Sequence, residues 1–465
     1  MNMQHHAARV LLNRIMNKQK TEYKMKVLKF GGTSVGSAER MQNVVKLISD
    51  GESKIVVLSA MSGTTNSLIE FTNYLRNGNP NGACEHSTVL HTKYMQTIKE
   101  LYKSEEYASA ATEKINSIFA HLRSLAFEPL SDELEKEIVA QGEIMSTNMV
   151  TFYMKELGLD VELLNALDFM RLAVNGEPDL GYIREHLLPL VDLEAAGKIY
   201  ITQGFICMNH EGSYDNLQRG GSDYTATLIG SAVNADEVQI WTDIDGVHNN
   251  DPRIVDGTTP VRNLHFEESA ELAYFGAKIL HPTCILPAKL TGTPVRLLNT
   301  MDPAAEGTRI DNNLTRPGEI KAIAAKDNIT AIKIKSGRML LAYGFLRKVF
   351  EVFEANKTSI DMVCTSEVGV SVSIDDDKRL DDIVAELQKI GTITVDRNMC
   401  IICVVGDLNW ENVGFEARAM EAMKDIPVRM VSYGGSNYNI SFLVREEDKV
   451  RALRSLSATI FDSNK

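Results

Sequence analysis

The sequence predicts an α/β protein in which a mainly parallel sheet lies between helices and is followed by two smaller α+β units. From residue 27 to about residue 300, continuous apolar runs alternate with helical patterns. Such runs are typical of parallel strands in a sheet that is covered on both faces. Beyond residue 329, one order of strands and helices occurs twice, which predicts two modules of the same kind.

The composition restricts the class of protein. With 44% apolar and 24% charged residues, the chain is at globular averages, which disfavours a disordered or fibrous protein. Its 465 residues are too many for one ordinary domain. No apolar run approaches the roughly 18 residues of a membrane span, and the net charge of −13 argues against a general binder of nucleic acids or anionic membranes. We therefore expect a cytoplasmic protein with neither a nucleic-acid nor a membrane partner.

The six cysteines are scattered and too few for the disulfide framework of a small secreted protein. Cys400 and Cys403 share one strand-like run, where a spacing of three places them on opposite faces of the strand. We therefore expect no metal site at this pair.

The first 24 residues carry five basic side chains and one acidic side chain. This composition is compatible with an organelle transit peptide. We favour the alternative that the chain begins upstream of a natural start at Met25, and we expect residues 1–24 to form a disordered extension.

The first region is expected to contain a ligand site at one edge of its sheet. A helix is predicted over Ser37–Ser49, because its apolar residues recur at helical spacing. A polar segment that contains glycine follows each expected strand. Because the carboxyl ends of parallel strands share one edge, these segments converge where α/β proteins bind ligands. The expected strands are Val27–Phe30, Ile55–Leu58, Ile199–Ile206 and Glu237–Trp241.

The stretch Asn299–Asn328 is rich in Pro, Gly and Asn and predicts a domain boundary. The two units that follow are expected to be paired ferredoxin-like modules. Strands of the first are expected at Ile329–Lys335, Ile360–Cys364 and Val368–Ile374, with helices around residues 345–353 and 380–387. The second has strands at Cys400–Val405, Val428–Tyr433 and Tyr438–Val444, with helices at Phe415–Met423 and Val450–Ile460. The predicted domains are residues 25–320, 321–395 and 396–465.

The sharpest local motif is Lys29-Phe30-Gly31-Gly32-Thr33-Ser34-Val35. Lys29 lies inside an expected buried strand, where an unpaired ammonium group is costly, so it needs an anionic partner such as a phosphate. The two glycines let the backbone approach that anion, and the N-terminus of the next helix favours it further. The alternative is a tight turn whose lysine reaches solvent. The P-loop spacing is absent.

A second motif, Arg219-Gly220-Gly221-Ser222-Asp223-Tyr224-Thr225, precedes an apolar helix and predicts another anion site at a helix start. Arg219 offers a planar fork to a carboxylate or a phosphate. Asp223 is expected to orient a nucleophile or to interact with phosphate-bound Mg²⁺, and the alternative is that it only caps its helix.

Three further segments carry weaker signals. Thr242–His248, followed by Asp251-Pro252-Arg253, fits the edge of a nucleotide site with Arg253 near a phosphate. Lys278 is a candidate phosphate cation or, with equal weight, a surface lysine. Glu143, in Gln141-Gly142-Glu143, is expected on a helix and is unremarkable by itself.

Taken together, the motifs resemble the aspartokinase branch of the amino-acid kinase family. They appear in the family's order from Lys29 to Pro282, and the two C-terminal units resemble tandem ACT domains, so the resemblance covers the chain after Met25. The motifs are K-F-G-G-T-S-V, V-V-L-S-A, Q-G-E, Q-G-F-I, R-G-G-S-D-Y-T-A, W-T-D, D-P-R and F-G-A-K-I-L-H-P. His248 and Gln218 depart from the family pattern, which often has tyrosine and glycine there.

The resemblance implies the amino-acid kinase fold and direct transfer of the γ-phosphoryl group of ATP, with Mg²⁺ carried mainly by the nucleotide, to the β-carboxylate of L-aspartate. By resemblance, Lys29 stabilises the transferring group and Asp223 organises the polar centre. The implied aspartate-binding residues are Ser59, Thr65, Glu143, Arg219 and Ser222. Those implied for ATP are Lys29, Gly31, Gly32, Thr242, Asp243, His248, Arg253 and Lys278.

The resemblance also implies feedback regulation by an end-product amino acid, with lysine as the first choice and threonine as the second. It implies a homodimer formed through the ACT domains, or a tetramer. The implied effector residues are Met339, Phe345, Leu346, Ser359, Asp361 and Glu367. No dinucleotide-binding G-x-G-x-x-G follows the second module, so a monofunctional kinase is expected. The alternatives are a catalytically dead amino-acid sensor on this fold and a sibling kinase that acts on another acid.

Overall fold

The computed structural model describes residues 25–461, apart from 218–219, 277–279, 314–315 and 338–342. The chain divides into two compact units. The first unit comprises Met1–Asp245 and Thr283–Glu306, and the second comprises Gly246–Pro282 and Gly307–Lys465. The predicted domain limits at residues 320 and 395 stay predictions.

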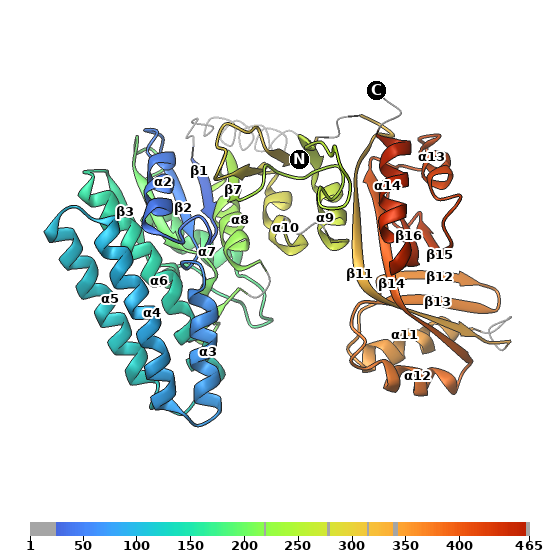
Figure 1. The fold of residues 1–465 in the computed structure, drawn as a ribbon, viewed down its shortest axis with the longest axis horizontal. Helices are drawn as coiled ribbons and strands as arrows, with labels where there is room; N and C mark the ends of the chain where they lie inside the picture. The colour runs from blue at the N-terminus through green and yellow to red at the C-terminus, as the bar shows by residue number, and fades with distance from the viewer. Residues whose placement is uncertain (1–24, 218–219, 277–279, 314–315, 338–342, 462–465) are drawn as a thin grey trace, which may run out of the picture. The chain divides into compact units, whose positions relative to one another are not determined.

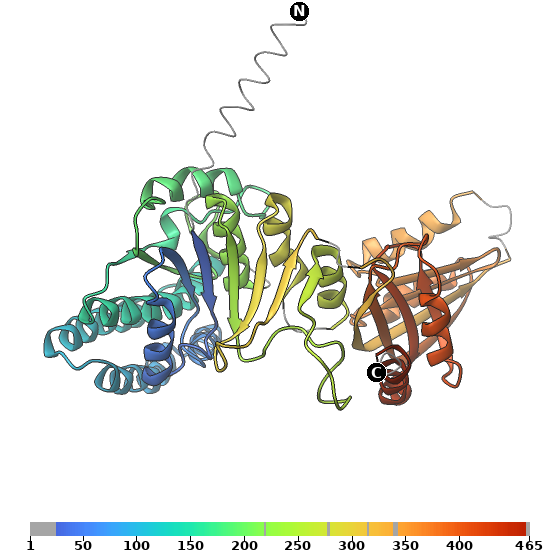
Figure 2. The same cartoon turned by 90° about the horizontal axis from the view of Figure 1, so that it is seen from above.

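A parallel sheet forms the centre of the first unit (Figures 1 and 2). Its strands follow the order β3-β4-β2-β1-β7-β9, and every neighbouring pair is parallel. This is the arrangement that continuous apolar runs predict. The strands are β1 (Lys26–Phe30), β2 (Lys54–Leu58), β3 (Val161–Leu164), β4 (Ile199–Gln203), β7 (Glu237–Thr242) and β9 (Val295–Asn299).

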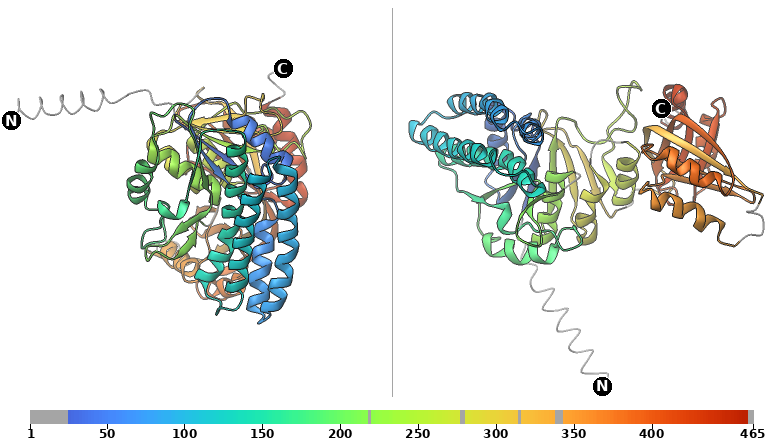
Figure 3. Two further views of the ribbon diagram at one scale, coloured as in Figure 1. Left: turned by 90° about the vertical axis from the view of Figure 1, so that its left-hand side faces the viewer. Right: turned by 90° about the horizontal axis from the view of Figure 1, so that it is seen from below.

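Helices cover both faces of this sheet. Leu28 and Phe30 of β1 pack into a core with one set of helices, so the alternating residues Val27 and Lys29 point to the opposite face. The helices of that core are α2 (Ala38–Ile48), α3 (Thr64–Arg76), α4 (Pro80–Leu101), α5 (Glu105–Leu125) and α6 (Asp132–Glu156), of which α3 to α6 lie side by side (Figure 3). Elsewhere in the unit lie α7 (Leu180–Leu187), α8 (Gly221–Val233), α10 (Pro282–Thr291) and the hairpin β5 (Ile206–Met208) and β6 (Tyr214–Asn216).

The second unit contains an antiparallel sheet with the strand order β12-β13-β11-β14-β16-β15. Two hydrophobic cores lie along it, one with each pair of helices. The strands are β11 (Ile320–Lys335), β12 (Met362–Ser366), β13 (Gly369–Ile374), β14 (Thr392–Gly406), β15 (Val428–Tyr433) and β16 (Asn439–Arg445). The helices are α11 (Phe345–Ala355), α12 (Leu380–Gln388), α13 (Phe415–Ala422) and α14 (Lys449–Ile460).

The same unit includes the parallel strands β8 (Asn263–His265) and β10 (Thr308–Asp311) and the helix α9 (Phe266–Tyr274). Helix α9 packs against β11 and β14. The described residues contain no helix that is both long and apolar enough to cross a membrane.

Candidate active site

A partly buried ion pair lies between strand β1 and helix α8. The ammonium nitrogen Nζ of Lys29 is 2.7 Å from Oδ1 of Asp223, and the two side chains are 13% and 18% exposed. Lys29 therefore has the anionic partner that its buried position requires. Asp223 does not cap its helix, because the N-cap residue is Gly220 and no side chain caps α8.

The start of α8 joins this ion pair to a polar cleft. Ser222 lies in the first turn of the helix, and its hydroxyl accepts a hydrogen bond of 2.9 Å from the hydroxyl of Ser59. Ser59 directly follows strand β2, so the carboxyl end of the sheet and a helix N-terminus meet here. Because the amides of a first helical turn carry partial positive charge, this position favours an anionic group.

The cleft has a volume of about 410 Å³. Its wall is built from segments that follow strands β1, β2 and β4, together with α3, α6 and α8. Gly32 is required where two of these segments meet, because a Cβ atom on it would lie 2.8 Å from the carbonyl oxygen of Ala60. The lining residues are Gly32, Ser59, Ala60, Met61, Ser62, Gly63, Thr65, Asn66, Glu143, Phe205, Gly221 and Ser222.

Glu143 is a buried carboxylate in the wall of this cleft. Its Oε1 accepts a hydrogen bond of 3.1 Å from the backbone N–H of Ala60, and its Oε2 has no hydrogen-bond partner among the described residues. Burial raises the pKa of Glu143 to about 7, against the smaller opposing effect of that hydrogen bond. A ligand ammonium group beside Oε2 would favour the ionised form.

The structure brings most of the predicted aspartate-binding residues together. Ser59, Thr65, Glu143 and Ser222 all line the cleft, and Gly32 of the predicted ATP set lies there as well. A Cβ atom on Gly31 would lie 3.6 Å from Nζ of Lys29, so this glycine adjoins the ion pair. Arg219, Lys278 and Met339 lie outside the described residues.

The remaining ATP candidates are divided between the two units. Thr242 ends β7 in the first unit, and its hydroxyl donates to Oδ1 of Asp243 over 3.1 Å. His248 and Arg253 belong to the second unit. Nδ1 of His248 is 3.0 Å from the hydroxyl of Thr258. Arg253 donates to both carboxylate oxygens of Asp251, over 2.9 and 2.7 Å.

Sequence reasoning missed three side chains in the cleft. Phe205 has a φ of 70°, a conformation that a bulky residue rarely adopts, and Ser62 and Asn66 also line the wall. Position was an available signal for Ser62, which lies in the polar segment after the expected strand Ile55–Leu58. Phe205 lies within the expected strand Ile199–Ile206 and Asn66 lies on α3, so no comparable signal for them was present in the sequence.

The described effector candidates differ in exposure. Phe345 is buried and Leu346 is exposed at the start of α11, while Ser359 and Glu367 are exposed in the segments before and after β12. Asp361 precedes β12, and its side chain is only 1% exposed because it contacts Lys326 and Tyr274.

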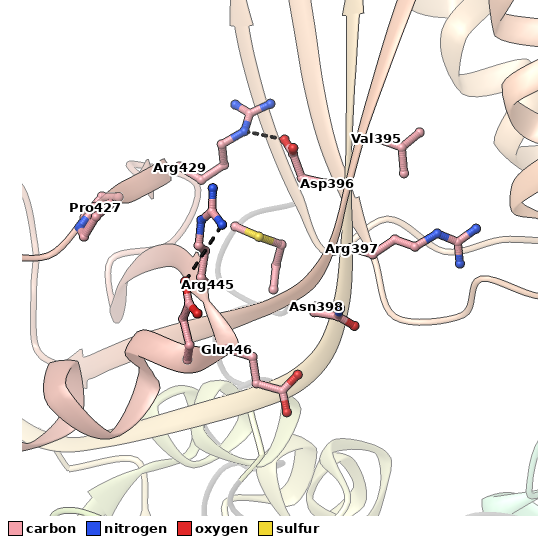
Figure 4. A pocket seen from close by; sticks show the side chains of 11 residues that line it. Val395, Asp396, Arg397, Asn398, Pro427, Arg429, Arg445 and Glu446 are labelled. Atoms are coloured by element: carbon pink, nitrogen blue, oxygen red, sulfur yellow. Dashed lines mark hydrogen bonds and ion pairs between the residues drawn. The ribbon is translucent and has the colours of Figure 1, made fainter.

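A second hollow, of about 570 Å³, lies in the second unit and contains none of the predicted residues (Figure 4). Three basic and three acidic side chains line it, and two ion pairs join them. Arg429 donates to Asp396 over 2.8 Å, and Arg445 lies 3.8 Å from Glu447. This compensation leaves no net charge to select a ligand, so we assign it no function.

Comparison with known proteins identifies the family. Residues 24–299 match the amino acid kinase family, and residues 402–460 match an ACT domain. Aspartokinase 1, chloroplastic, of Arabidopsis thaliana is 34% identical over 94% of this chain and 80% of its own length. This chain belongs to the aspartokinases. The family membership predicted from the motifs is thus confirmed. The enzyme is a kinase with the amino-acid kinase fold and a C-terminal ACT domain.

Other relatives agree over the same span. The lysine-sensitive aspartokinase 3 of Escherichia coli is 31% identical to the enzyme over 94% of this chain and 99% of its own length. The structure of Escherichia coli aspartokinase III in complex with lysine and aspartate is 32% identical, with a TM-score of 0.77 over 94% of this chain and 99% of that one. The complex with aspartate and ADP is 30% identical, with a TM-score of 0.76 over 94% and 100%.

Proposed function

We propose that the cleft of the first unit binds L-aspartate beside the γ-phosphate of ATP and that Lys29 stabilises the group in transfer. The observation that carries this proposal is the Lys29–Asp223 ion pair at the uncapped start of α8, next to the cleft. A β-carboxylate oxygen of aspartate attacks the γ-phosphorus, the bond to the β,γ-bridging oxygen breaks, and ADP leaves. The nucleophile is already ionised, so positioning and charge neutralisation suffice for catalysis.

Each group in the cleft has a distinct task in this proposal. Glu143 faces the substrate ammonium group with its unpartnered Oε2. Arg219 forms a bidentate contact to a substrate carboxylate. Ser59 and Ser222 are already hydrogen-bonded to each other, so the substrate meets side chains that are held in place. Asp223 keeps the Lys29 ammonium group aimed at the end of β1.

The enzyme is proposed to use ATP as its Mg²⁺ complex. Asp223 and Asp243 supply hard carboxylate oxygens of the kind that Mg²⁺ prefers. Among the described residues, Oδ1 of Asp223 has the ammonium group of Lys29 beside it and no hydrogen-bond partner. Bound Mg²⁺ would neutralise charge on the β- and γ-phosphates. Thr242, Asp243, His248, Arg253 and Lys278 are the proposed nucleotide contacts.

The ACT modules are proposed to bind free L-lysine as an inhibitor, with threonine as the alternative effector. This proposal is supported by the likeness to a lysine-sensitive relative and to a structure that contains lysine. It is also supported by the buried carboxylate of Asp361 in the first module. We further propose a cytoplasmic homodimer formed through these modules, or a tetramer; sedimentation analysis of the purified chain tests the oligomeric state.

An ADP-release assay tests the proposed reaction. We expect release that depends on L-aspartate and Mg²⁺ and that is absent with L-glutamate or N-acetylglutamate. Free lysine, threonine and methionine are then titrated against the rate. No release with any acid would favour the catalytically dead sensor, and release with another acid alone would favour a sibling kinase.

A further inference from the structure

Three side chains in the second unit surround the ammonium group of Lys326. Nζ of Lys326 lies 2.8 Å from Oδ1 of Asp361, 2.9 Å from Oδ2 of Asp375 and 4.3 Å from the ring centre of Tyr274. The hydroxyl of Tyr274 also donates to Oδ1 of Asp361 over 2.8 Å. Two carboxylates and an aromatic face are the surroundings that recognise an alkylammonium group. We call this cluster the ammonium recess.

The ammonium recess holds more negative than positive charge. Two carboxylates face one lysine, and Oδ2 of Asp361 is buried without a hydrogen-bond partner among the described residues. Burial raises the pKa of the Asp361 carboxyl, although Lys326 and Tyr274 act in the opposite direction. A buried oxygen without a partner is costly, so a further cation would be favourable there. With its side chain only 1% exposed, Asp361 is reachable from solvent only if the recess opens.

The ammonium recess is joined to the residues directly after α9, as far as Gly276. Tyr274 is the last residue of α9, which packs beside β11 (Figure 1). Gly276 has a φ of 110°, and a Cβ atom there would lie 2.2 Å from the carbonyl oxygen of Ala325, the neighbour of Lys326. Gly276, just after α9, therefore lies directly on strand β11 beside Lys326.

We propose that Lys326 is an internal occupant of the effector site and competes with free L-lysine for Asp361. When the ammonium group of the effector binds Asp361, that carboxylate is lost as a partner to Lys326 and Tyr274. The end of α9 is then released from β11, and the proposed ATP contact of Lys278 weakens. This inference rests on the proposed regulation by lysine. It supplies the differential affinity that inhibition requires, because the closed recess excludes the effector and the open recess binds it.

The competition is tested with Lys326→Met at pH 8, by calorimetric titration of free L-lysine. Lys449→Met is the matched control, because Lys449 pairs with Asp327, the next residue along β11, at 2.6 Å and is 19% exposed against 18% for Lys326. We expect Lys326→Met to bind lysine at least about 5-fold more tightly than the parent, because a competing closed state is lost. Lys449→Met should stay within about twofold. Equal or weaker binding by Lys326→Met would overturn the competition.

The connection to ATP is tested with Tyr274→Phe, which keeps the ring and removes the bond to Asp361. Tyr433→Phe, whose hydroxyl donates to Leu408 over 3.4 Å, is the control. The readout is the factor by which saturating lysine raises KM for ATP. We expect Tyr274→Phe to bind lysine but to lower this factor by about 5-fold or more, whereas Tyr433→Phe keeps it. An unchanged factor in Tyr274→Phe would overturn the connection.

Measurements on the parent enzyme distinguish a failure of the proposed regulation from a failure of the internal competition. If it binds none of lysine, threonine and methionine, the proposed regulation fails and the competition fails with it. If it binds lysine and is inhibited, while Lys326→Met and Tyr274→Phe behave like the parent, only the internal competition is wrong.

Discussion

Lys29 carries an ammonium group inside a buried parallel strand. Asp223, from a helix that packs on that strand, is its acidic partner among the described residues. We expect Lys29→Met to lower kcat by about 10²–10³, because one electrostatic contact to a transition state is typically worth that much. Steady-state ADP release at saturating aspartate and ATP measures the effect.

Lys54→Met is the control for this substitution. Lys54 is 1% exposed on the neighbouring strand β2 and pairs with Asp50, away from the cleft. The control should lower stability and leave kcat within about twofold of the parent. A Lys29→Met enzyme that keeps more than half of the parent kcat would remove Lys29 from the mechanism.

Glu143 predicts a pH dependence of substrate binding. Its carboxyl group has a pKa of about 7 because it is buried, and only the ionised form attracts the substrate ammonium group. KM for aspartate should therefore rise as the pH falls through about 7, and KM for ATP should change less. A KM for aspartate that is constant between pH 6 and pH 8.5 would contradict the role of Glu143.

The same carboxyl group predicts a cost in stability. Its pKa is higher in the folded chain, about 7 against 4.5. Burial of the carboxyl group therefore costs no stability below about pH 4.5, and the free energy of unfolding falls as the pH rises from there through 7. At pH 8 without substrate, Glu143→Gln should have a free energy of unfolding up to about 3 kcal/mol higher than the parent and should unfold at a higher temperature. The difference should shrink towards zero near pH 4. Scanning calorimetry at both pH values decides, and a destabilised variant at pH 8 would refute the prediction.

The need for a partner at Lys29 was predictable from one strand, but the identity of that partner was not. A buried ammonium group requires an anion wherever it occurs, which is a local rule. That the anion includes Asp223 depends on α8 packing against β1, a long-range contact. Glu143 was likewise unremarkable in the sequence. Its role depends on the packing of α6 beside Ala60, which places its carboxylate in the wall of the cleft.

At the scale of elements, the close meeting of the segments after β1 and β2 predicts a sharp difference between two adjacent glycines. A Cβ atom on Gly32 would be 2.8 Å from a backbone oxygen, whereas one on Gly31 would meet nothing closer than 3.6 Å. Gly32→Ala should cost about 1–3 kcal/mol and lower Tm by several degrees. Gly31→Ala should leave Tm nearly unchanged. Thermal unfolding of both variants without ligand is the measurement, and equal Tm values would show that the loops can separate freely.

The ACT strands show what periodicity alone leaves open. The pattern predicted short strands at Ile329–Lys335 and Cys400–Val405, but β11 begins at Ile320 and β14 begins at Thr392. Each strand passes through both cores, and β11 changes register between Lys326 and Ile329. Asn328 and Asn398 have positive φ there. An irregularity of this kind changes which residues face the core. The alternation of apolar and polar residues is therefore interrupted, and the sequence pattern of one long strand looks like that of a shorter one.

At the scale of the molecule, the sequence predicted the class of each half, and the structure adds a grouping of distant segments that the sequence does not show. Residues 246–282 lie before the predicted boundary, yet they belong to the compact unit that contains the ACT modules. Helix α9 explains this membership, because it packs against β11 and β14 and its Glu271 accepts a hydrogen bond from Asn439 of β16. Such contacts join segments that are far apart in the sequence, so the local composition of either segment does not predict them.

This division makes regulation testable as a property of the whole enzyme. Asp361→Asn keeps the shape of the side chain and an oxygen that can accept the hydrogen bond from the Tyr274 hydroxyl. It removes the negative charge that is proposed to attract the ammonium group of the effector. We expect the lysine concentration for half-inhibition to rise about 5–150-fold, the range of a lost coupling of about 1–3 kcal/mol. Asp377→Asn is the control, because Asp377 forms an exposed ion pair with Arg397 at 2.9 Å outside the ammonium recess. Inhibition curves at fixed, subsaturating ATP compare the two variants. An unchanged curve for Asp361→Asn would place the effector elsewhere on the molecule, whereas a shift of equal size in both variants would show that net charge, and not this carboxylate, controls inhibition.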